Sequence, residues 1–334
     1  MSAKLPRVTC VYQNHHLDST RWSIYEPRDG DIIVVTSYKS GTTWMQQILT
    51  RLLNISSTDS IDLRDVSPWV EARFRGVSKE TLRNVVAEMP GRRLLKSHLP
   101  LHGLPYYENV RYVIVGRDPR DVFMSLFNHY RNYTDLAFKM LNDPAERVGE
   151  AIGPCPDDPR TLWRNWMTRG FFDWESEGWP FWSNLGHTQS YWDHRHLPNF
   201  LFVHYADMLA DLACEVRRVA AFVGVDVSDA GVARVAEATT FANVKKTANE
   251  TPPESDKFRL IFKDGMQSFF FKGSNGRWRD VLNADDLALY EAAKARVLSA
   301  DCAQWLENGL AGCAQLANQG PHNKSHLTQP HLII

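Results

Sequence analysis

The sequence predicts an α/β fold, a single domain with a central parallel sheet flanked by helices. Short apolar, β-branched runs alternate with helix-like runs along the chain, which is typical of a parallel sheet covered on both faces. At residues 31–52 a strand-like run, a glycine-containing turn and a helix-like run follow one another in a P-loop-like order. No internal repeat or low-complexity linker divides the chain, so we expect one domain.

The first strand and helix lie near the N-terminus. Residues 31–38 form a short β-branched run after a turn signal at 28–30. A helix is expected from Thr43, because its apolar residues recur at the i, i+3, i+4, i+7 spacing of one helix face: Met45, Ile48, Leu49 and Leu52.

Three further strands are expected along the chain. A short apolar run within residues 91–100 stops at a proline, and residues 111–117 and 199–205 form longer apolar runs. Because parallel strands need crossover connections, helices are expected between and after them.

Two of these helices are indicated directly. Asp118 and Pro119 are typical of the N-cap and first position of a helix, and residues 207–224 form an amphipathic stretch after the last strand.

Less regular segments lie between these elements. Residues 131–162 and 245–268 are rich in turn-forming or polar residues and are interpreted as long loops or lids. The domain is expected to span residues 1–315, with a loosely held tail at 316–334.

The composition excludes several classes of protein. Hydrophobic residues make up 43% and charged residues 23%, as in ordinary globular proteins. The net charge of -1 gives no reason to expect a nucleic-acid partner. No run of 18 apolar residues and no signal peptide is present, so no membrane partner is expected. The five scattered cysteines indicate neither a disulfide framework nor a zinc site, and a cytoplasmic location is predicted.

The turn after the first strand, KSGTT, is a candidate anion site. Free backbone N–H groups at a helix start and the helix dipole attract negative charge. Gly41 permits close approach of the backbone, and Lys39 supplies a positive charge. The Walker pattern is absent because no glycine stands directly before Lys39. The alternative is an ordinary polar turn, so phosphate or sulfate binding is only weakly indicated by this turn alone.

A second candidate phosphate site follows the strand at 111–117. Arg117 ends that strand, and Ser125 follows eight residues later on the next helix. An arginine forks onto a phosphate dianion, and a hydroxyl can donate to the same group. Taken alone, a strand-end arginine is more often a surface ion-pair partner.

Six motifs, in order and at similar spacing, resemble the cytosolic sulfotransferase family: KSGTTW, KSHLP, GRDPRDVFMS, FVHYADM, TTFANVKK and FFFKGSNGRW. The resemblance runs from about residue 30 to 300. It implies that the donor is 3′-phosphoadenosine 5′-phosphosulfate (PAPS), with PAP as the product. The strand-loop-helix at 31–52 would then be a phosphosulfate-binding one.

The resemblance also implies the donor contacts. Lys39, Ser40, Gly41, Thr42 and Thr43 would cradle the 5′-phosphosulfate, and Trp44 would stack on the adenine. The 3′-phosphate and adenosine would be held by the remaining implied residues, which are Arg117, Ser125, Tyr205, Thr239, Phe241, Phe271, Lys272 and Gly273.

His98 is similar to the family's catalytic base, and an imidazole can accept a proton near neutral pH. Lys96 and Lys39 would neutralise the transferring sulfonate and the leaving oxygen, so no metal is expected. Lys96 and His98 are also expected to contact the acceptor, a phenol, alcohol or amine.

Further acceptor contacts are expected from an aromatic-rich segment at 165–192. Its end resembles the family's H-x-Q-x-x-W segment, which points to His187, and Phe171 and Phe172 are candidates for an apolar wall. The alternative for most of these aromatics is that they only cover the sheet.

Three positions depart from the family pattern. Tyr38 stands where proline is usual, Phe271 replaces the arginine of the RKG motif, and Arg277 replaces an acidic residue. We expect donor binding to persist and to depend more strongly on Arg117 and Lys272.

The family's dimer motif, K-x-x-x-T-V-x-x-x-E, is not visible in RDVLNADDLALYE. A homodimer is therefore still open, but dimerisation through that motif is not expected.

Two rival functions stay open at this point. An ATP-dependent kinase would need a Walker motif and a magnesium-binding acid, and neither is evident. A PAP-binding or PAPS-binding regulatory protein without turnover is the other. The presence of His98 with Lys96 and Lys39 favours the transferase.

Overall fold

The structure is a computed structural model that describes residues 5–53, 63–74, 76–145, 147–270 and 272–309. Two predictions lie outside these residues: the tail at 316–334 and the donor contact at Phe271.

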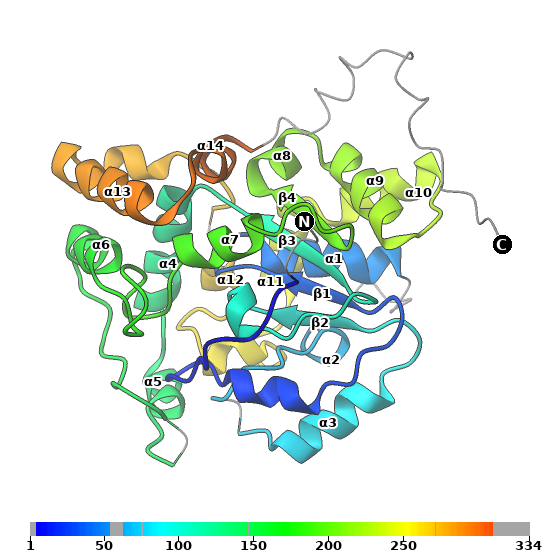
Figure 1. Ribbon diagram of the computed structural model, residues 1–334, viewed down its shortest axis with the longest axis horizontal. Coiled ribbons are helices and arrows are strands. Elements are labelled where there is room, and N and C mark those ends of the chain that lie inside the picture. Colours follow the sequence, from blue (N-terminus) through cyan, green and yellow to red (C-terminus); the bar gives the residue numbers. More distant parts are fainter. Residues whose placement is uncertain (1–4, 54–62, 75, 146, 271, 310–334) are drawn as a thin grey trace.

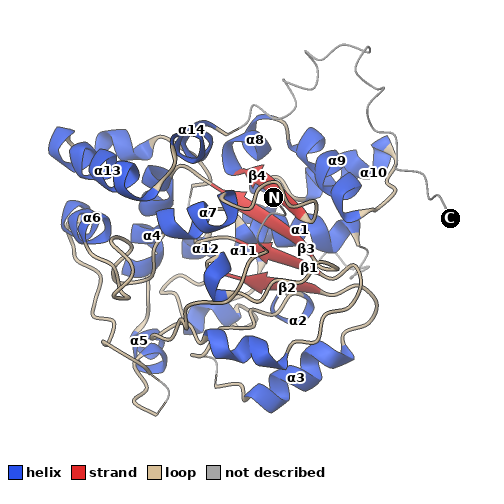
Figure 2. Cartoon of the chain, in the orientation of Figure 1, coloured by secondary structure: helices blue, strands red, loops and turns tan. Residues whose placement is uncertain are grey.

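A four-stranded parallel sheet forms the centre of the molecule (Figures 1 and 2). Its strands are β1 (Ile32–Val35), β2 (Leu94–Ser97), β3 (Arg111–Gly116) and β4 (Phe200–His204). The strand order is β2-β1-β3-β4, and every pair is parallel. The predicted α/β fold class is confirmed, and each strand lies inside its predicted run.

Both faces of the sheet are buried. Ile32 and Val34 pack into one hydrophobic core, whereas Ile33 and Val35 pack into the other, as the period of two along a strand requires. All four side chains are fully buried. This explains why the strand is a continuous β-branched run instead of an alternating one.

The smaller core lies under α1 (Thr42–Leu52), α9 (Leu212–Val223) and α10 (Asp229–Ala238). The predicted face of α1 is buried there, at Met45, Ile48, Leu49 and Leu52. The predicted helical stretch at 207–224 is divided, because α8 (Tyr205–Ala210) ends before Asp211, whose side chain caps α9 by accepting from the Cys214 backbone N–H.

The larger core is aromatic and lies on the opposite face. It is covered by helices that include α4 (Pro119–Arg131), α6 (Pro159–Thr168), α7 (Leu185–Trp192), α13 (Ala284–Val297) and α14 (Ala300–Asn308). Asp118 caps α4 by accepting from the Arg120 backbone N–H at 2.9 Å, and Pro119 is its first residue, as predicted.

The two segments interpreted as long loops contain short helices, and this part of the prediction was wrong. The first contains α5 (Asp135–Leu141). The second begins inside α11 (Phe241–Glu250) and continues through η3 (Lys257–Leu260) to α12 (Met266–Phe269). The cap residues Thr134 and Thr240 accept from backbone N–H groups at their starts. Such short helices have little periodicity, so packing on the rest of the domain, more than local pattern, specifies them.

The remaining described elements are short or peripheral: η1 (Ser19–Ile24), α2 (Leu63–Val66), α3 (Lys79–Glu88), η2 (Leu101–Gly103) and η4 (Arg277–Asp280). Across the described ranges, no helix has the length and apolar character that crossing a membrane requires. Cys10, Cys155 and Cys302 are free thiols, whereas Cys214 is disulfide-bonded. The cysteine spacing gave no indication of the disulfide at Cys214.

Candidate active site

A cavity of about 610 Å³ lies where the four strands end. It is lined by the residue that directly follows each of three strands: His98 after β2, Arg117 after β3 and Tyr205 after β4. The turn after β1 contributes Tyr38 and Lys39. Ligands of open α/β sheets bind at the carboxyl ends of the strands, where the strand order reverses. The order β2-β1-β3-β4 places that reversal at β1 and β3.

The turn between β1 and α1 is built to present backbone groups. Lys39 has φ 52° and Gly41 has φ 109°, both in the left-handed region. A Cβ at Gly41 would lie 3.0 Å from the ring of Tyr205, so glycine also permits a close approach. No side chain caps α1, which leaves its first N–H groups for an anion.

Tyr38, one of the three positions noted above as departures, fixes this turn to the aromatic core. Its buried hydroxyl donates to the Trp182 carbonyl at 2.9 Å and accepts from Trp166 Nε1 at 2.7 Å. The turn is therefore held at its start by two hydrogen bonds.

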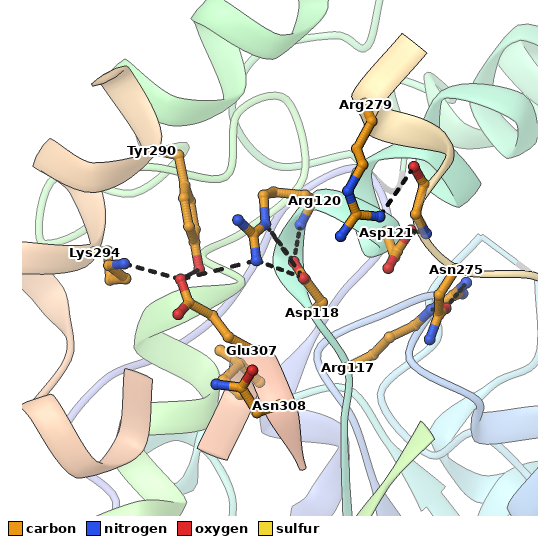
Figure 3. Close-up of polar contacts among 12 residues, drawn as sticks. Arg117, Asp118, Arg120, Asp121, Asn275, Arg279, Tyr290, Lys294, Glu307 and Asn308 are labelled. Carbon is orange, nitrogen blue, oxygen red and sulfur yellow. Dashed lines mark hydrogen bonds and ion pairs between the residues drawn. The ribbon is translucent and has the colours of Figure 1, made fainter. Parts of the chain in front are cut away.

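Arg117 is held in one orientation. Its guanidinium donates to the Lys39 carbonyl at 3.1 Å. It also donates to Asn275 Oδ1 at 3.1 and 2.9 Å (Figure 3). The same group lies 4.0 Å from the centre of the Tyr205 ring. A buried, oriented guanidinium facing a cavity is suited to bind a phosphate.

The start of α4 beside Arg117 is stiffened by a charged network (Figure 3). Arg120 pairs with Asp118 at 2.7 Å and approaches Glu307 of α14 at 4.0 Å. Asp121 accepts from the Gly276 backbone N–H at 2.6 Å. These contacts fix the position of the segment around Asn275 relative to the end of β3.

His98 is oriented as a proton acceptor. Its Nδ1–H donates to the Thr36 carbonyl at 2.8 Å, because a carbonyl can only accept. Its backbone N–H donates to Glu71 Oε1 at 2.5 Å. The Nε2 atom makes no hydrogen bond to any residue that the structure describes. Burial, with a smaller contribution from Lys96, lowers the pKa of His98 well below its ordinary value, so the ring is neutral near pH 7.

The two predicted lysines reach the same cavity. Lys39 Nζ donates to His129 Nδ1 at 3.2 Å and lies 4.5 Å from the centre of the Phe269 ring. Lys96 Nζ lies 4.5 Å from the Trp69 ring. Burial, followed by the charges of Arg117 and Lys96, lowers the pKa of Lys39 to about 7.

The structure gathers most predicted site residues in one place. The predicted residues that line the cavity are Lys39, Gly41, Thr42, Thr43, Trp44, Lys96, His98, Arg117, Ser125, Tyr205, Thr239, Phe241, Lys272 and Gly273. Arg277, one of the departures from the family pattern, lines it too.

Four predicted residues do not line the cavity. The Ser40 hydroxyl turns back to donate to the Tyr38 carbonyl at 3.1 Å. His187 is buried on α7 beside Tyr191. Phe171 packs on His15, and Phe172 packs on Tyr12 and Trp174. The two phenylalanines pack among other aromatic rings. This packing favours the alternative interpretation, in which such aromatics only cover the sheet.

Sequence reasoning missed the wall at the other end of the cavity. It is formed by aromatic and histidine side chains that include His16, His129, Tyr133, Phe258, Phe262 and Phe269. His129 could have been predicted to face the same cavity as Ser125, because it lies four residues later and such residues share a helix face. The others come from segments without a helical or strand period.

The residues that the structure describes hold no group of three His, Cys, Asp or Glu side chains placed to bind a metal ion. The positive groups that face the cavity are instead lysine and arginine side chains.

Comparisons with known proteins place this geometry in context. The Sulfotransferase domain profile matches residues 29–299. The chain is 29% identical to a glycolipid sulfotransferase of Mycobacterium bovis over 322 residues, covering 90% of this chain and 95% of that protein. It is 28% identical to an amine sulfotransferase of Oryctolagus cuniculus, covering 78% of each chain.

Solved structures give the same fold. Mouse sulfotransferase SULT7A1 complexed with PAP superposes with a TM-score of 0.63 at 20% identity, covering 86% of this chain and 92% of that one. A retinol dehydratase in complex with androsterone and PAP gives 0.63 at 22% identity, covering 82% of each chain.

Proposed function

This chain belongs to the sulfotransferase domain family, and on that premise we propose that it moves a sulfuryl group from PAPS to a hydroxyl or amine of a small, largely apolar acceptor. One observation carries the proposal: Lys39, Lys96, His98 and Arg117 converge on one cavity at the carboxyl ends of the strands. Such a set can bind an anionic donor and remove one proton from an acceptor.

The donor would lie between the β1–α1 turn and the end of β3. The free N–H groups at the start of α1 suit the 5′-phosphosulfate. Arg117, with Ser125 in the same cavity, suits the 3′-phosphate, and Trp44 and Tyr205 suit the adenosine. When bound, PAPS would supply the activated sulfuryl group. The printed titles of two structural neighbours name PAP as their ligand.

The proton would pass to His98 Nε2. The Nδ1–H bond to Thr36 fixes the tautomer in which Nε2 is the acceptor. Lys39 and Lys96 would stabilise the charge that grows on the leaving oxygen, as positioned cations do in group transfer. No metal is needed for these roles, because two ammonium groups already face the cavity.

The acceptor would lie against the aromatic wall on the other side of His98. Tyr133, Phe262 and Phe269 give this part of the cavity an apolar surface, which suits a phenol, an apolar alcohol or an arylamine. A lipid hydroxyl also fits the proposal, since one similar protein is named a glycolipid sulfotransferase.

A transfer assay tests the proposal. The protein is incubated with radiolabelled PAPS and a panel of phenols, alcohols and amines, without magnesium. We expect label in an acceptor product, and loss of that label in His98→Ala. His102→Ala is the matched control, because His102 bonds Tyr12 outside the cavity.

Two other results would favour the rival functions. Donor binding without label transfer to any acceptor would indicate a PAP-sensing protein. No PAPS binding at all would reject the proposal, and a parallel assay with ATP and magnesium would then test for a kinase.

A further inference from the structure

His129 is a partly buried histidine of the aromatic wall, and its ring reaches Lys39 of the donor turn. It lies on α4 and lines the cavity with Ser125, one helical turn earlier. Its Nδ1 is 3.2 Å from Lys39 Nζ. An ammonium has no acceptor, so Lys39 donates and His129 accepts through a neutral ring.

The rest of the imidazole is held by aromatic packing. Its ring centre lies 4.7 Å from that of Phe262, 5.3 Å from that of Tyr133 and 5.8 Å from that of Phe269. Tyr133 directly follows α4, whereas Phe262 and Phe269 come from the distant segment that ends with α12. The acceptor atom is therefore fixed in place before any ligand binds.

Lys39 is consequently held at both ends. Its backbone has φ 52°, and its carbonyl accepts from Arg117 at 3.1 Å. Its ammonium is bound by His129 and covered by Phe269 at 4.5 Å. A lysine side chain has four rotatable bonds and considerable rotamer entropy, so a fixed acceptor determines where its charge lies.

We propose that His129 is a positioning residue, which directs the Lys39 ammonium to the boundary between the donor turn and the acceptor wall. This inference rests on the proposed sulfuryl transfer. Charge on the transferring group develops at that boundary, so a correctly placed ammonium lowers the barrier to transfer more than it strengthens binding of PAP, which lacks the sulfonate.

The pKa of His129 indicates which side chain of the Lys39–His129 pair carries the proton. Burial, followed by the charge of Lys39, lowers the pKa of His129 well below its ordinary value. The other titratable groups around His129 include Tyr133, His16, Lys96 and His98, and none of these four is a carboxylic acid. A neutral acceptor favours the charged form of Lys39, so removing the acceptor should lower the Lys39 pKa further.

Two variants separate positioning from packing. His129→Phe keeps an aromatic ring and removes the acceptor, whereas His129→Asn keeps an acceptor near the position of Nδ1. In His129→Phe we expect kcat to fall about tenfold or more, the factor expected for one hydrogen bond to a charged group. PAP affinity should stay within about twofold of the wild type in both variants, because the loss is confined to transfer.

The pH profile of the reaction distinguishes positioning of the Lys39 charge by His129 from a merely structural role of His129. In His129→Phe the alkaline limb of kcat/KM for PAPS should move to lower pH, whereas in His129→Asn most of kcat and the wild-type limb should be retained. Wild-type kcat in His129→Phe would overturn the inference. Equal losses of kcat in both variants, with no shift of the alkaline limb, would also overturn the inference.

A measurement without turnover keeps the inference separate from the proposed function. The Lys39 side chain is titrated by NMR in the wild type, His129→Phe and His129→Asn, with Lys39→Met assigning the resonance. A lower Lys39 pKa in His129→Phe alone supports the pairing, and identical titrations in all three proteins overturn it. If the wild type transfers no sulfuryl group, the proposed function fails, but this titration still decides on His129.

Discussion

The two ends of the cavity are built differently. At the donor end, Arg117 and Tyr205 directly follow β3 and β4, whereas Lys39 lies in the turn after β1, where its carbonyl accepts from Arg117. At the acceptor end, residues such as His16 and Phe262 come from the N-terminal segment and from loops between short helices. The donor end thus depends on the sheet, whereas the acceptor end depends on packing between distant segments.

This difference suggests which end can vary. Strand ends keep their positions because parallel pairing fixes the register of β1, β2, β3 and β4. Loop segments tolerate substitution and insertion more readily. Under the proposed function, a strand-end donor site could be combined with a different acceptor wall. Two similar proteins are named for different acceptors, a glycolipid and an amine.

The largest expected effect is at the donor end. Arg117→Ala removes the guanidinium that faces the cavity, and PAP affinity should fall roughly 10- to 100-fold, the range for hydrogen bonds to a charged group. Isothermal titration of PAP measures this loss. Arg195→Ala is a matched control, because Arg195 pairs with Asp301 away from the cavity and its loss should leave PAP affinity unchanged. Wild-type affinity in Arg117→Ala would contradict a phosphate-binding role for Arg117.

The next effect tests the connection between the two ends. Tyr38→Phe removes the hydroxyl that joins the donor turn to Trp166 and Trp182. The free energy of unfolding should fall by about 1–3 kcal/mol, because two buried polar groups lose their partner. Chemical denaturation monitored by tryptophan fluorescence measures it. Tyr106→Phe, at a half-exposed tyrosine, should change the free energy of unfolding less. An equal change in both would argue against a special role of Tyr38.

The third effect is a pH dependence that originates behind the acceptor wall, where the His15 ring packs against His16. Burial lowers the pKa of His15 from 6.5 to about 4, so the unfolded chain binds its proton first. The stability that this group contributes is complete above pH 6.5 and decreases as the pH falls toward 4, by about 1.4 kcal/mol per pH unit. His16 and His129 shift in the same direction.

Denaturation curves between pH 7.5 and 4.5 measure this dependence. His15→Asn should flatten the lower part of the curve, since one group that titrates on unfolding is removed. An unchanged slope in His15→Asn would show that the acid sensitivity has another origin.

Local pattern was sufficient to predict the part of the cavity that the strand ends form. The β-branched run before Tyr38, the helix face of α1 and the cap formed by Asp118 and Pro119 all depend on residues close in the chain. Parallel strands then bring their carboxyl ends together, so Lys39, His98 and Arg117 could be expected near one another before any side chain was placed. The short helices α5 and α12 were missed because they have too few turns to show a period.

The sequence by itself determined the sheet, the turn between β1 and α1, and the identity of the groups at the strand ends. Only the tertiary structure placed His129 beside Lys39, 90 residues away in the chain, and Tyr38 between two tryptophans. It also placed Phe171, Phe172 and His187 outside the cavity lining. The physical reason is that strands and caps are specified by neighbouring residues. The wall of a cavity is specified by side-chain packing between segments whose separation in the chain carries no periodic signal.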